Sequence, residues 1–412
     1  MPALGMSLAG RLQGRDFAVI GCAGYILTFA APVPWDLSLI VLGVCGILAA
    51  IRGSRTVAYL RIPLMPETAL FLSTVLLSTI FAKDIIRSLT FSAALVPAAL
   101  LFYLFAAHFR TMKDLRQPYV AFIAVSLALS AGILAIAWWN PSLGPRDWIG
   151  LLGVPILVVP NDAILMAAVA PFCVAMLNAD DQPWVKALAA AALVVTLTAI
   201  IVLQSRGAML TFLFECGLMV IRQRPRHALA GLLAVCLLFV VVDGLLGFPM
   251  VGKLGFLNDR LSLWLAAGAM FLDHPVLGYG PHTYELFYGA KLAQFDLPEW
   301  LPVGEEITPW PHSLYLEVAA EQGVVGLAAL GVLLTRALTL LQRARSGLTD
   351  AARTYLSACS CSLLAFLVAG AFELTLLRIW VPVLLFLLLG TVSFLAHSPD
   401  LRREARLQKD RS

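Results

Sequence analysis

Twelve long apolar runs dominate the 412-residue sequence and leave few folds open to it. Each approaches the length of about 20 residues with which a helix crosses a bilayer. Continuous runs of this kind satisfy their backbone hydrogen bonds as helices, whereas barrel strands are short and alternate in polarity. We therefore predict an all-α polytopic membrane protein with about twelve transmembrane helices. The predicted spans are 17–33, 36–51, 66–82, 89–108, 119–138, 162–178, 185–204, 207–221, 227–245, 323–341, 354–372 and 378–396.

The composition excludes a soluble globular protein. Hydrophobic residues make up 60% of the chain and charged residues only 13%, and the mean hydropathy is +0.87. Soluble domains carry about 25% charged residues. The formal net charge of +4 is small, and in a membrane protein the placement of basic residues matters more than their sum. We expect contact with membrane lipids and no nucleic-acid partner.

The basic residues are distributed unequally over the two sides of the predicted bundle. With the N-terminus in the cytoplasm, 21 of the 29 Lys and Arg residues lie on cytoplasmic segments and 8 on the opposite side. This asymmetry follows the positive-inside rule and puts both termini in the cytoplasm. The first apolar run leads straight into a second and has no clear cleavage site, so we expect it to stay uncleaved.

One long loop divides the chain and is predicted to lie on the extracytoplasmic side. The predicted units are nine spans in 1–246, the loop in 247–323, three spans in 324–396 and a basic cytoplasmic tail in 397–412. The loop is rich in aromatic residues and proline, holds 9 acidic and 3 basic residues, and is expected to carry short helices. Long loops in compact proteins are commonly functional, so the site is sought there.

The sequence lacks the motifs of several common classes of enzyme and metal site. The sequence has no Gly-rich phosphate loop, no His-Glu-x-x-His and no Gly-x-Ser-x-Gly. His274 and His282 are eight residues apart with no evident third ligand. The seven cysteines all lie inside apolar runs, which is typical of buried hydrophobic residues rather than of disulfides or metal ligands. We predict no metal site and no cofactor.

Three polar residues on the predicted outer face are candidates for chemistry, and each has a structural alternative. Arg206 lies where one span ends and the next begins, and a snorkelling role explains it equally well. Arg260 precedes an amphipathic stretch of the loop, and pairing with Asp259 or Asp273 is its alternative. His312 opens the helix that leads into the tenth span, where a histidine is more often a structural cap than a base.

Two charges fall deep inside predicted spans. Glu215 lies about 10 Å below the surface at 1.5 Å per residue, and Arg336 lies beyond the middle of the tenth span. Charges at such depth cost about 2.5 to 3.5 kcal/mol each on insertion scales and tend to pair. We therefore predict an interhelical contact between them.

The motifs around the three polar residues together resemble the O-antigen ligase and polymerase superfamily of membrane glycosyltransferases. The similarity covers roughly 160–330, and the plan of twelve spans with one large late loop is similar to the ligase branch over the whole chain. The motifs are Pro160-Asn161-Asp162, Ser205-Arg206-Gly207, Arg260-Leu-Ser-Leu-Trp264, His274-Pro275-Val-Leu-Gly278-Tyr279-Gly280, and His312-Ser313-Leu-Tyr315-Leu-Glu317 running to Glu321-Gln322-Gly323.

The resemblance implies a reaction and roles for these residues. Members of the superfamily move a glycan from undecaprenyl diphosphate to an acceptor hydroxyl, which for a ligase belongs to lipid A core. Such a reaction needs cations at the leaving diphosphate and a base at the acceptor. Arginine holds phosphate oxygens with two parallel hydrogen bonds, and histidine titrates near neutral pH. We assign Arg206 and Arg260 to the diphosphate and His312 to the acceptor, and expect metal-independent inverting transfer.

A second group of residues is predicted to contribute to substrate binding. Basic residues on outer connections are expected to line the same anionic site, and three further residues to contact sugar. Ordinary interfacial roles explain them as well. The group comprises Lys83, Arg87, Arg146, Tyr279, His282 and Tyr315. Either candidate arginine changed to alanine is expected to cripple transfer without unfolding the bundle.

Other functions remain open at this stage. A polymerase of the same superfamily shares the donor but uses another lipid-linked unit as acceptor. Polymerases often have two sizeable outer loops, and here the other candidate, 139–161, has only 23 residues. Transfer onto protein usually goes with a longer chain. A twelve-span transporter is the alternative from a different class, but the chain has no visible repeat and few midplane charges.

Overall fold

The computed structural model describes residues 12–31, 35–52, 62–223, 237, 255–298, 310–398 and 401. Within these ranges the regular structure is helical, and no strand occurs. The elements are α1 Gly14–Phe29, α2 Trp35–Arg52, α3 Met65–Ile80, α4 Ile85–His108, α5 Met112–Trp139, α6 Pro145–Leu152, η3 Pro160–Asp162, α7 Ala163–Ala167, α8 Ala170–Ala179, α9 Pro183–Val202, α10 Arg206–Gln223, α12 Gly255–Asp273, α13 Tyr284–Leu292, α14 Leu314–Ala344, α15 Asp350–Gly370 and α16 Trp380–His397.

The apolar runs predicted from the sequence fold as helices. Eleven predicted spans lie, over their described residues, on one or more of these helices. The twelfth, 227–245, lies outside the described residues except for residue 237. Seven of the described helices are long and apolar enough to cross a membrane, whereas α1 and α3 have only 16 residues. The all-α membrane fold is confirmed at this level, and the count of twelve spans stays a prediction.

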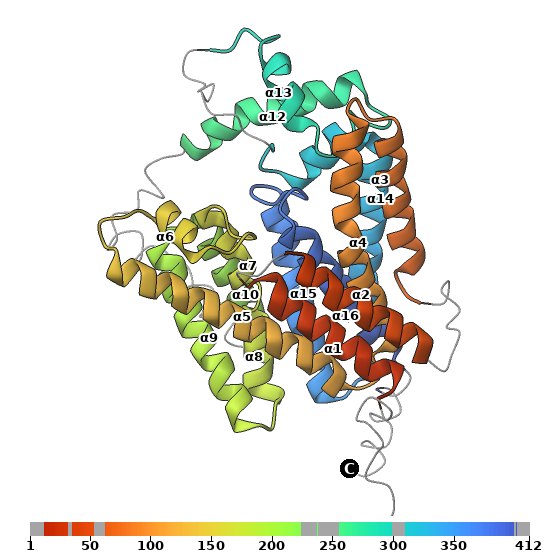
Figure 1. The fold of residues 1–412 in the computed structure, drawn as a ribbon, viewed down its shortest axis with the longest axis vertical. Coiled ribbons are helices and arrows are strands. Elements are labelled where there is room, and N and C mark those ends of the chain that lie inside the picture. The colour runs from red at the N-terminus through yellow and green to blue at the C-terminus, as the bar shows by residue number, and fades with distance from the viewer. Residues whose placement is uncertain are drawn as a thin grey trace, which may run out of the picture.

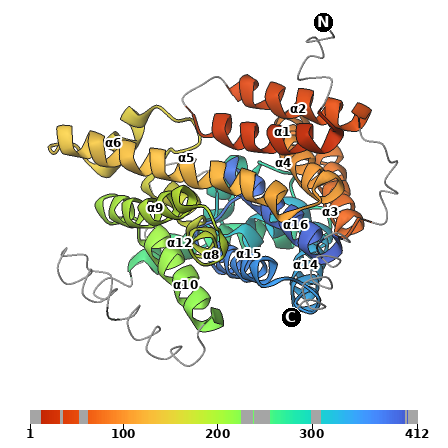
Figure 2. The same ribbon diagram turned by 90° about the horizontal axis from the view of Figure 1, so that it is seen from below.

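α16 forms the centre of the bundle because it is apolar on every side. Its residues from Trp380 to Leu395 are all buried, which is the pattern expected of a helix with no polar face. It packs against α4, α14 and α15. Figure 2 shows α16 enclosed by its neighbours, with the α1–α2 hairpin on one side of the bundle. The six described cysteines are free, and Cys22, Cys173, Cys359 and Cys361 are buried as expected.

α12 and α13 lie together at one end of the molecule, above α3, α4 and α14 in Figure 1. We name this the α12 end. α12 packs against both α13 and α14, and Met270 and Tyr284 are buried between these helices. The segment predicted as a long loop therefore carries helices, as expected from its amphipathic stretch.

α14 has a non-helical residue, Gly323, and at this point the segment before α13 packs against α14 and joins the α12 end to the bundle. Gly323 has φ +66° and ψ −165°, a conformation that other residues rarely adopt. The segment Pro275 to Gly280 runs beside the break: Tyr279 and Gly280 donate backbone hydrogen bonds to Ala320 and Glu321, and Val324 donates to Pro275. A Cβ at Gly323 would lie 2.3 Å from the Val276 backbone, so only glycine allows this approach.

The predicted contact between Glu215 and Arg336 is wrong. Arg336 pairs instead with Glu67 of α3, at 3.4 Å, because α3 lies along α14. Glu215 is 1% exposed, and its Oε2 has no hydrogen-bond partner among the described residues. The depth of a charge in a span predicts that it needs a polar neighbour, but not which helix supplies one.

Candidate functional site

A short connection between two helices places the Arg206 motif against the turn that carries Glu373. α9 ends at Val202 and α10 begins at Arg206, so only three residues turn the chain. Gly207, in the first turn of α10, packs against Glu373: a Cβ there would lie 3.1 Å from the Glu373 Cγ. Glu373 itself lies in the turn between α15 and α16. The Arg206 motif and this turn are therefore in direct contact.

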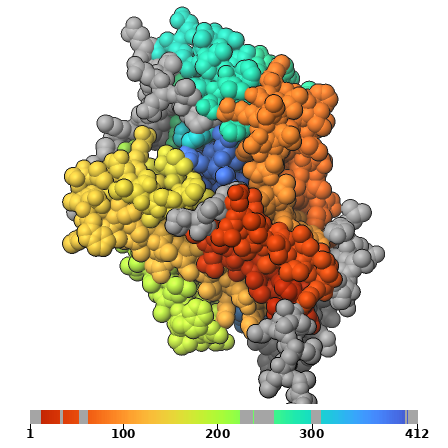
Figure 3. Space-filling model, in the orientation of Figure 1, coloured from red at the N-terminus to blue at the C-terminus, as the bar shows by residue number. Residues whose placement is uncertain are grey.

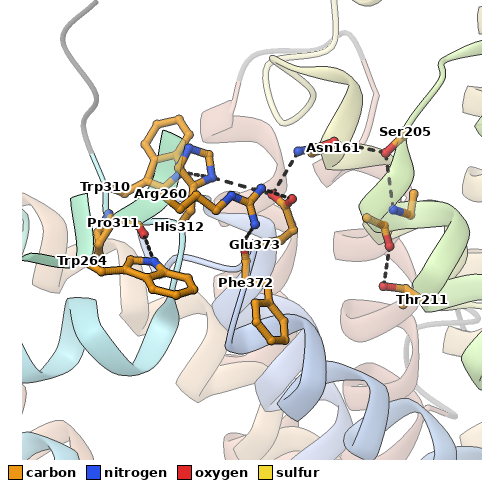
Figure 4. Close-up of polar contacts among 12 residues, drawn as sticks. Asn161, Ser205, Thr211, Arg260, Trp264, Trp310, Pro311, His312, Phe372 and Glu373 are labelled. Atoms are coloured by element: carbon orange, nitrogen blue, oxygen red, sulfur yellow. Dashed lines mark hydrogen bonds and ion pairs between the residues drawn. The ribbon is translucent and has the colours of Figure 1, made fainter. Parts of the chain in front are cut away.

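Glu373 is the centre of the site. Its Oε1 accepts from Arg260, and its Oε2 accepts from Asn161 Nδ2 at 2.9 Å and lies 3.7 Å from His312 Nδ1. Figure 4 shows these three side chains converging on the carboxylate. Burial alone would raise the pKa of the Glu373 carboxyl, but His312 and Arg260 outweigh it, so the pKa lies below its ordinary value. Glu373 is therefore ionised in the site.

Arg260 and Trp264 fasten α12 to the site from one face of the helix. Arg260 donates to Glu373 and to the carbonyl of Phe372. Trp264 lies one helical turn further along, and its Nε1 donates to the carbonyl of Pro311 at 3.0 Å. The alternative that Arg260 pairs with Asp273 is wrong, because Asp273 pairs with Lys291; the Asp259 side chain lies outside the described residues.

His312 stands just before α14 in a constrained conformation. Its φ is +52°, in the left-handed region that is costly for a residue with a side chain. The cap of α14 is Ser313, whose hydroxyl accepts from the Leu316 amide, so the alternative that His312 caps the helix is wrong. Trp310 Nε1 donates to His312 Nδ1 at 3.3 Å. The imidazole is thus held by Trp310 and lies beside Glu373.

Arg206 differs from Arg260 in having no partner among the described residues. Its side chain is half-buried, and within the described part of the chain no ion pair or hydrogen bond engages its guanidinium. Its neighbour Ser205 donates to Asn161 Oδ1 at 3.3 Å, and the Ala208 amide donates to the Ser205 hydroxyl. These contacts join the Pro160-Asn161-Asp162 and Ser205-Arg206-Gly207 motifs and leave one cation available for an anionic ligand.

A second ion pair supports the site from the side. Asp162 accepts from Trp380 Nε1 at 3.1 Å and lies 3.5 Å from Arg378 Nη1. The Arg378 guanidinium carbon lies 4.3 Å from the centre of the Trp310 ring. Burial lowers the pKa of Arg378, and Asp162 opposes this shift. The pair therefore links three separate segments and supports the indole that holds His312.

Glu317 fixes the turn that carries Glu373. Both of its carboxylate oxygens accept from the Leu376 amide at 3.1 Å, and the side chain is 1% exposed. The motif that begins at His312 therefore supplies two residues: His312 lies in the site, and Glu317 holds the backbone of the turn that carries Glu373.

The residues of the second predicted group lie elsewhere, and most of them have protein partners. Arg87 pairs with Glu285 and donates to the His282 carbonyl at 2.7 Å. Burial, with Arg87 nearby, lowers the pKa of His282. The Lys83 amide donates to the Tyr279 carbonyl at 2.9 Å. These four predicted residues join the α3–α4 connection to the α12 end.

The other two members of that group are separate from this cluster and from each other. The Tyr315 hydroxyl donates to the Leu367 carbonyl at 2.8 Å, which ties the first turn of α14 to α15. Arg146 lies exposed on the short helix α6 and has no polar contact within the described ranges. The substrate-binding roles of these residues stay predictions.

Sequence reasoning missed Glu373 and the pair of Asp162 with Arg378 as parts of the site. Glu373 follows one predicted span directly and Arg378 begins the next, at a short connection like the one that drew attention to Arg206. The sequence feature that could have identified them is an acidic residue at the end of a predicted span, because a carboxylate near arginines on the outer face is expected to pair with one of them. Among the described residues, no group of three or more His, Cys, Asp or Glu side chains is placed to hold a metal ion.

Comparison with known proteins bears on the motifs just described. Residues 191–331 match the family model described as O-antigen ligase, and this segment contains Arg206, Arg260 and His312. A search of curated proteins found no match. The apolar helices and this match indicate a multi-pass membrane protein with a glycosyltransferase-type activity. The match confirms the resemblance seen in the sequence motifs and supports membership of this chain in the O-antigen ligase/polymerase superfamily.

Proposed function

We propose that this protein is an O-antigen ligase, which transfers a glycan from undecaprenyl diphosphate to a sugar hydroxyl of lipid A core. One observation carries the proposal: three motifs far apart in the sequence converge on Glu373, with Arg260 and His312 beside its carboxylate and the Arg206 turn packed against it. The match to the ligase family, over residues that include all three, supports the same chemistry.

The proposed reaction is a direct displacement. His312 takes the proton of the acceptor hydroxyl, the hydroxyl oxygen attacks the anomeric carbon, and the bond to the diphosphate breaks with its electron pair on the phosphate oxygen. Arg206 and Arg260 stabilise the charge that accumulates there, which favours metal-independent transfer. No carboxylate is assigned as a nucleophile, so the anomeric carbon is inverted. Arg206, whose guanidinium has no partner in the described ranges, is the first docking point for the diphosphate.

The proposed setting is the bacterial inner membrane. We place both termini in the cytoplasm and the α12 end in the periplasm, because 21 of the 29 basic residues then lie on cytoplasmic segments. A hollow in the surface, seen in Figure 3 between the yellow α5–α6 and orange α3–α4 regions, lies beneath α12 and α13. Such a hollow suits a donor that arrives in the bilayer and an acceptor that arrives from its surface.

Deletion of the gene tests the proposal against its alternatives. Without a ligase, lipopolysaccharide loses its glycan-capped core and long lipid-linked polymer accumulates; without a polymerase, a single repeat unit stays on the core. Complementation with the wild-type gene is the control. A transporter would give no covalent product when purified protein is supplied with donor and acceptor and no energy source.

A further inference from the structure

The Glu373 carboxylate contacts both a proposed substrate-binding cation and the proposed base. Its Oε1 accepts from Arg260, and its Oε2 accepts from Asn161 and lies 3.7 Å from His312 Nδ1. That last separation is too long for a hydrogen bond. In the unliganded protein, therefore, Glu373 forms an ion pair with Arg260 and lies next to His312 without a hydrogen bond to it.

The hydrogen bond from Trp310 to His312 Nδ1 selects the tautomer that carries its proton on Nε2. In this tautomer Nε2 is unable to act as a base. An indole N–H only donates, so His312 Nδ1 accepts the bond from Trp310 Nε1, and the proton of the neutral imidazole lies on Nε2. Nε2 has no hydrogen-bond partner among the described residues. For Nε2 to accept a proton, Nδ1 must carry one and needs an acceptor of its own. Glu373 Oε2 is in position to be that acceptor.

Binding of a diphosphate changes the balance at Arg260. Both of its terminal nitrogens are already engaged, one by Glu373 and one by the Phe372 carbonyl. A diphosphate brought in by Arg206 competes for the same cation and repels the Glu373 carboxylate. The Glu373 side chain is only 11% exposed, and a buried carboxylate without a cation is costly. His312 is the neighbouring group that can replace Arg260 as its partner.

We propose that Glu373 is a positioning residue that couples donor binding to activation of His312. The diphosphate displaces the carboxylate from Arg260, and the imidazole, 25% exposed, releases its Nε2 proton to water and takes a proton from water on Nδ1. The carboxylate then accepts from Nδ1–H of His312 in place of the Trp310 contact, and Nε2 is left free to take the acceptor proton. This inference rests on the proposed function. Glu373 stays ionised throughout: the proton moves from the acceptor hydroxyl to Nε2, and the resulting imidazolium pairs with Glu373 while the leaving diphosphate pairs with Arg260.

The charged surroundings of Glu373 fit this exchange. Arg260 faces it from α12, His312 from the segment before α14, and the Arg206 turn packs on it from α10. Arg378, in the same turn, is paired with Asp162. Among the described groups, Arg260 therefore forms the ion pair with Glu373, His312 is the neighbouring group that can replace it, and the exchange is between these two.

The experiment measures binding and turnover separately in the full-length protein. Glu373→Gln keeps the shape of the side chain and removes its charge. We measure the Kd for farnesyl diphosphate, as a soluble polyprenyl diphosphate, and kcat for glycan transfer. The coupling predicts opposite changes: diphosphate binds about five- to tenfold more tightly because its competitor is gone, whereas kcat falls about 100-fold because His312 loses its acceptor.

Two further variants control the measurement. Asp180→Asn removes another buried, arginine-paired carboxylate, whose partner Arg116 lies 3.3 Å away, and leaves the Glu373 contacts intact; diphosphate affinity should not change. Trp310→Phe removes the N–H that competes for His312 Nδ1. It should raise kcat without weakening diphosphate binding, and this variant tests the inference even where Glu373→Gln fails to fold.

The outcomes separate the inference from the function beneath it. If Glu373→Gln weakens diphosphate binding and lowers kcat together, or changes neither, the carboxylate is merely structural and the coupling is overturned. A loss of turnover in Trp310→Phe contradicts it as well. Wild-type protein that neither binds farnesyl diphosphate nor transfers glycan overturns the ligase proposal itself.

Discussion

Arg206 and Arg260 are both arginines, but they differ in whether a carboxylate neutralises their charge. Arg260 is paired with a buried carboxylate, whereas the Arg206 guanidinium has no partner in the described part of the chain. The sequence predicted that either could be replaced without harm to the fold. The pairing with Glu373 changes that expectation for Arg260, because removing one member of a buried pair leaves an uncompensated charge.

The first prediction separates these two arginines. Arg206→Ala and Arg260→Ala should each lower the transfer rate about 100- to 1,000-fold, because each removes one cation from the leaving diphosphate. Arg206→Ala should change the free energy of unfolding by less than about 0.5 kcal/mol. Arg260→Ala should lower it by about 3 to 5 kcal/mol. Unfolding in detergent with a parallel transfer assay measures both, and equal stability losses would contradict the assignment.

The second prediction concerns pH and Glu373. The pKa of its carboxyl in the folded protein lies below the ordinary value of 4.5, since His312 and Arg260 outweigh burial. A depressed pKa in the folded state stabilises the protein above the unfolded value, and this stabilisation is lost as pH falls through the folded value. The melting temperature of the wild type should therefore drop as the pH falls below about 5, and Glu373→Gln should lose part of that drop. Parallel curves for the two proteins would argue against an ionised Glu373.

At the scale of single elements, the broken helix α14 holds the α12 end to the bundle. Gly323 within α14 and Gly278 of the neighbouring segment both have positive φ, and a Cβ on either would lie 2.3 Å from the other segment's backbone. The two glycines therefore allow two backbones to lie against each other. Because Arg260 comes from α12 and His312 from the start of α14, this contact also determines how the two reach Glu373.

The third prediction tests that contact. Gly323→Ala should lower the free energy of unfolding by at least about 1 to 3 kcal/mol from backbone strain, before the clash with Val276 is counted. Gly331→Ala is the matched control: it lies in the same helix, with open space around its Cβ, and should be neutral or gain up to about 1 kcal/mol. Thermal unfolding of both variants decides, and equal melting temperatures would show that the break is not required.

The sequence predicts elements well and pairings poorly, for a physical reason. Hydropathy shows which stretches of the chain are apolar enough to lie in lipid or in the protein core. Predicted spans such as 36–51 and 378–396 therefore differ from α2 and α16 by only one or two residues at each end. The choice of ionic partner depends on how helices pack. Arg336 therefore paired with Glu67 instead of Glu215, and Glu373 went unnoticed although Arg206, Arg260 and His312 were identified from their motifs.

At the scale of the whole molecule, the polar site lies between a helical bundle and the helices of its α12 end. Figure 1 shows α12 and α13 standing over the tops of α3 and α14, and Figure 3 shows the surface hollowed beneath them. The site draws on η3, α10, α12, the start of α14 and the α15–α16 turn. An arrangement built from five segments suits an enzyme that must hold two lipid-borne substrates together.

Transfer by purified protein is the most direct measurement of this account. Full-length wild type and His312→Ala are incubated with undecaprenyl-diphosphate-linked glycan and lipid A core, with a chelator present and no energy source, and the joined product is quantified. We predict product from the wild type and at least about a 100-fold lower rate from His312→Ala. Equal rates from the two proteins, or an absolute requirement for a divalent metal, would contradict the proposed site.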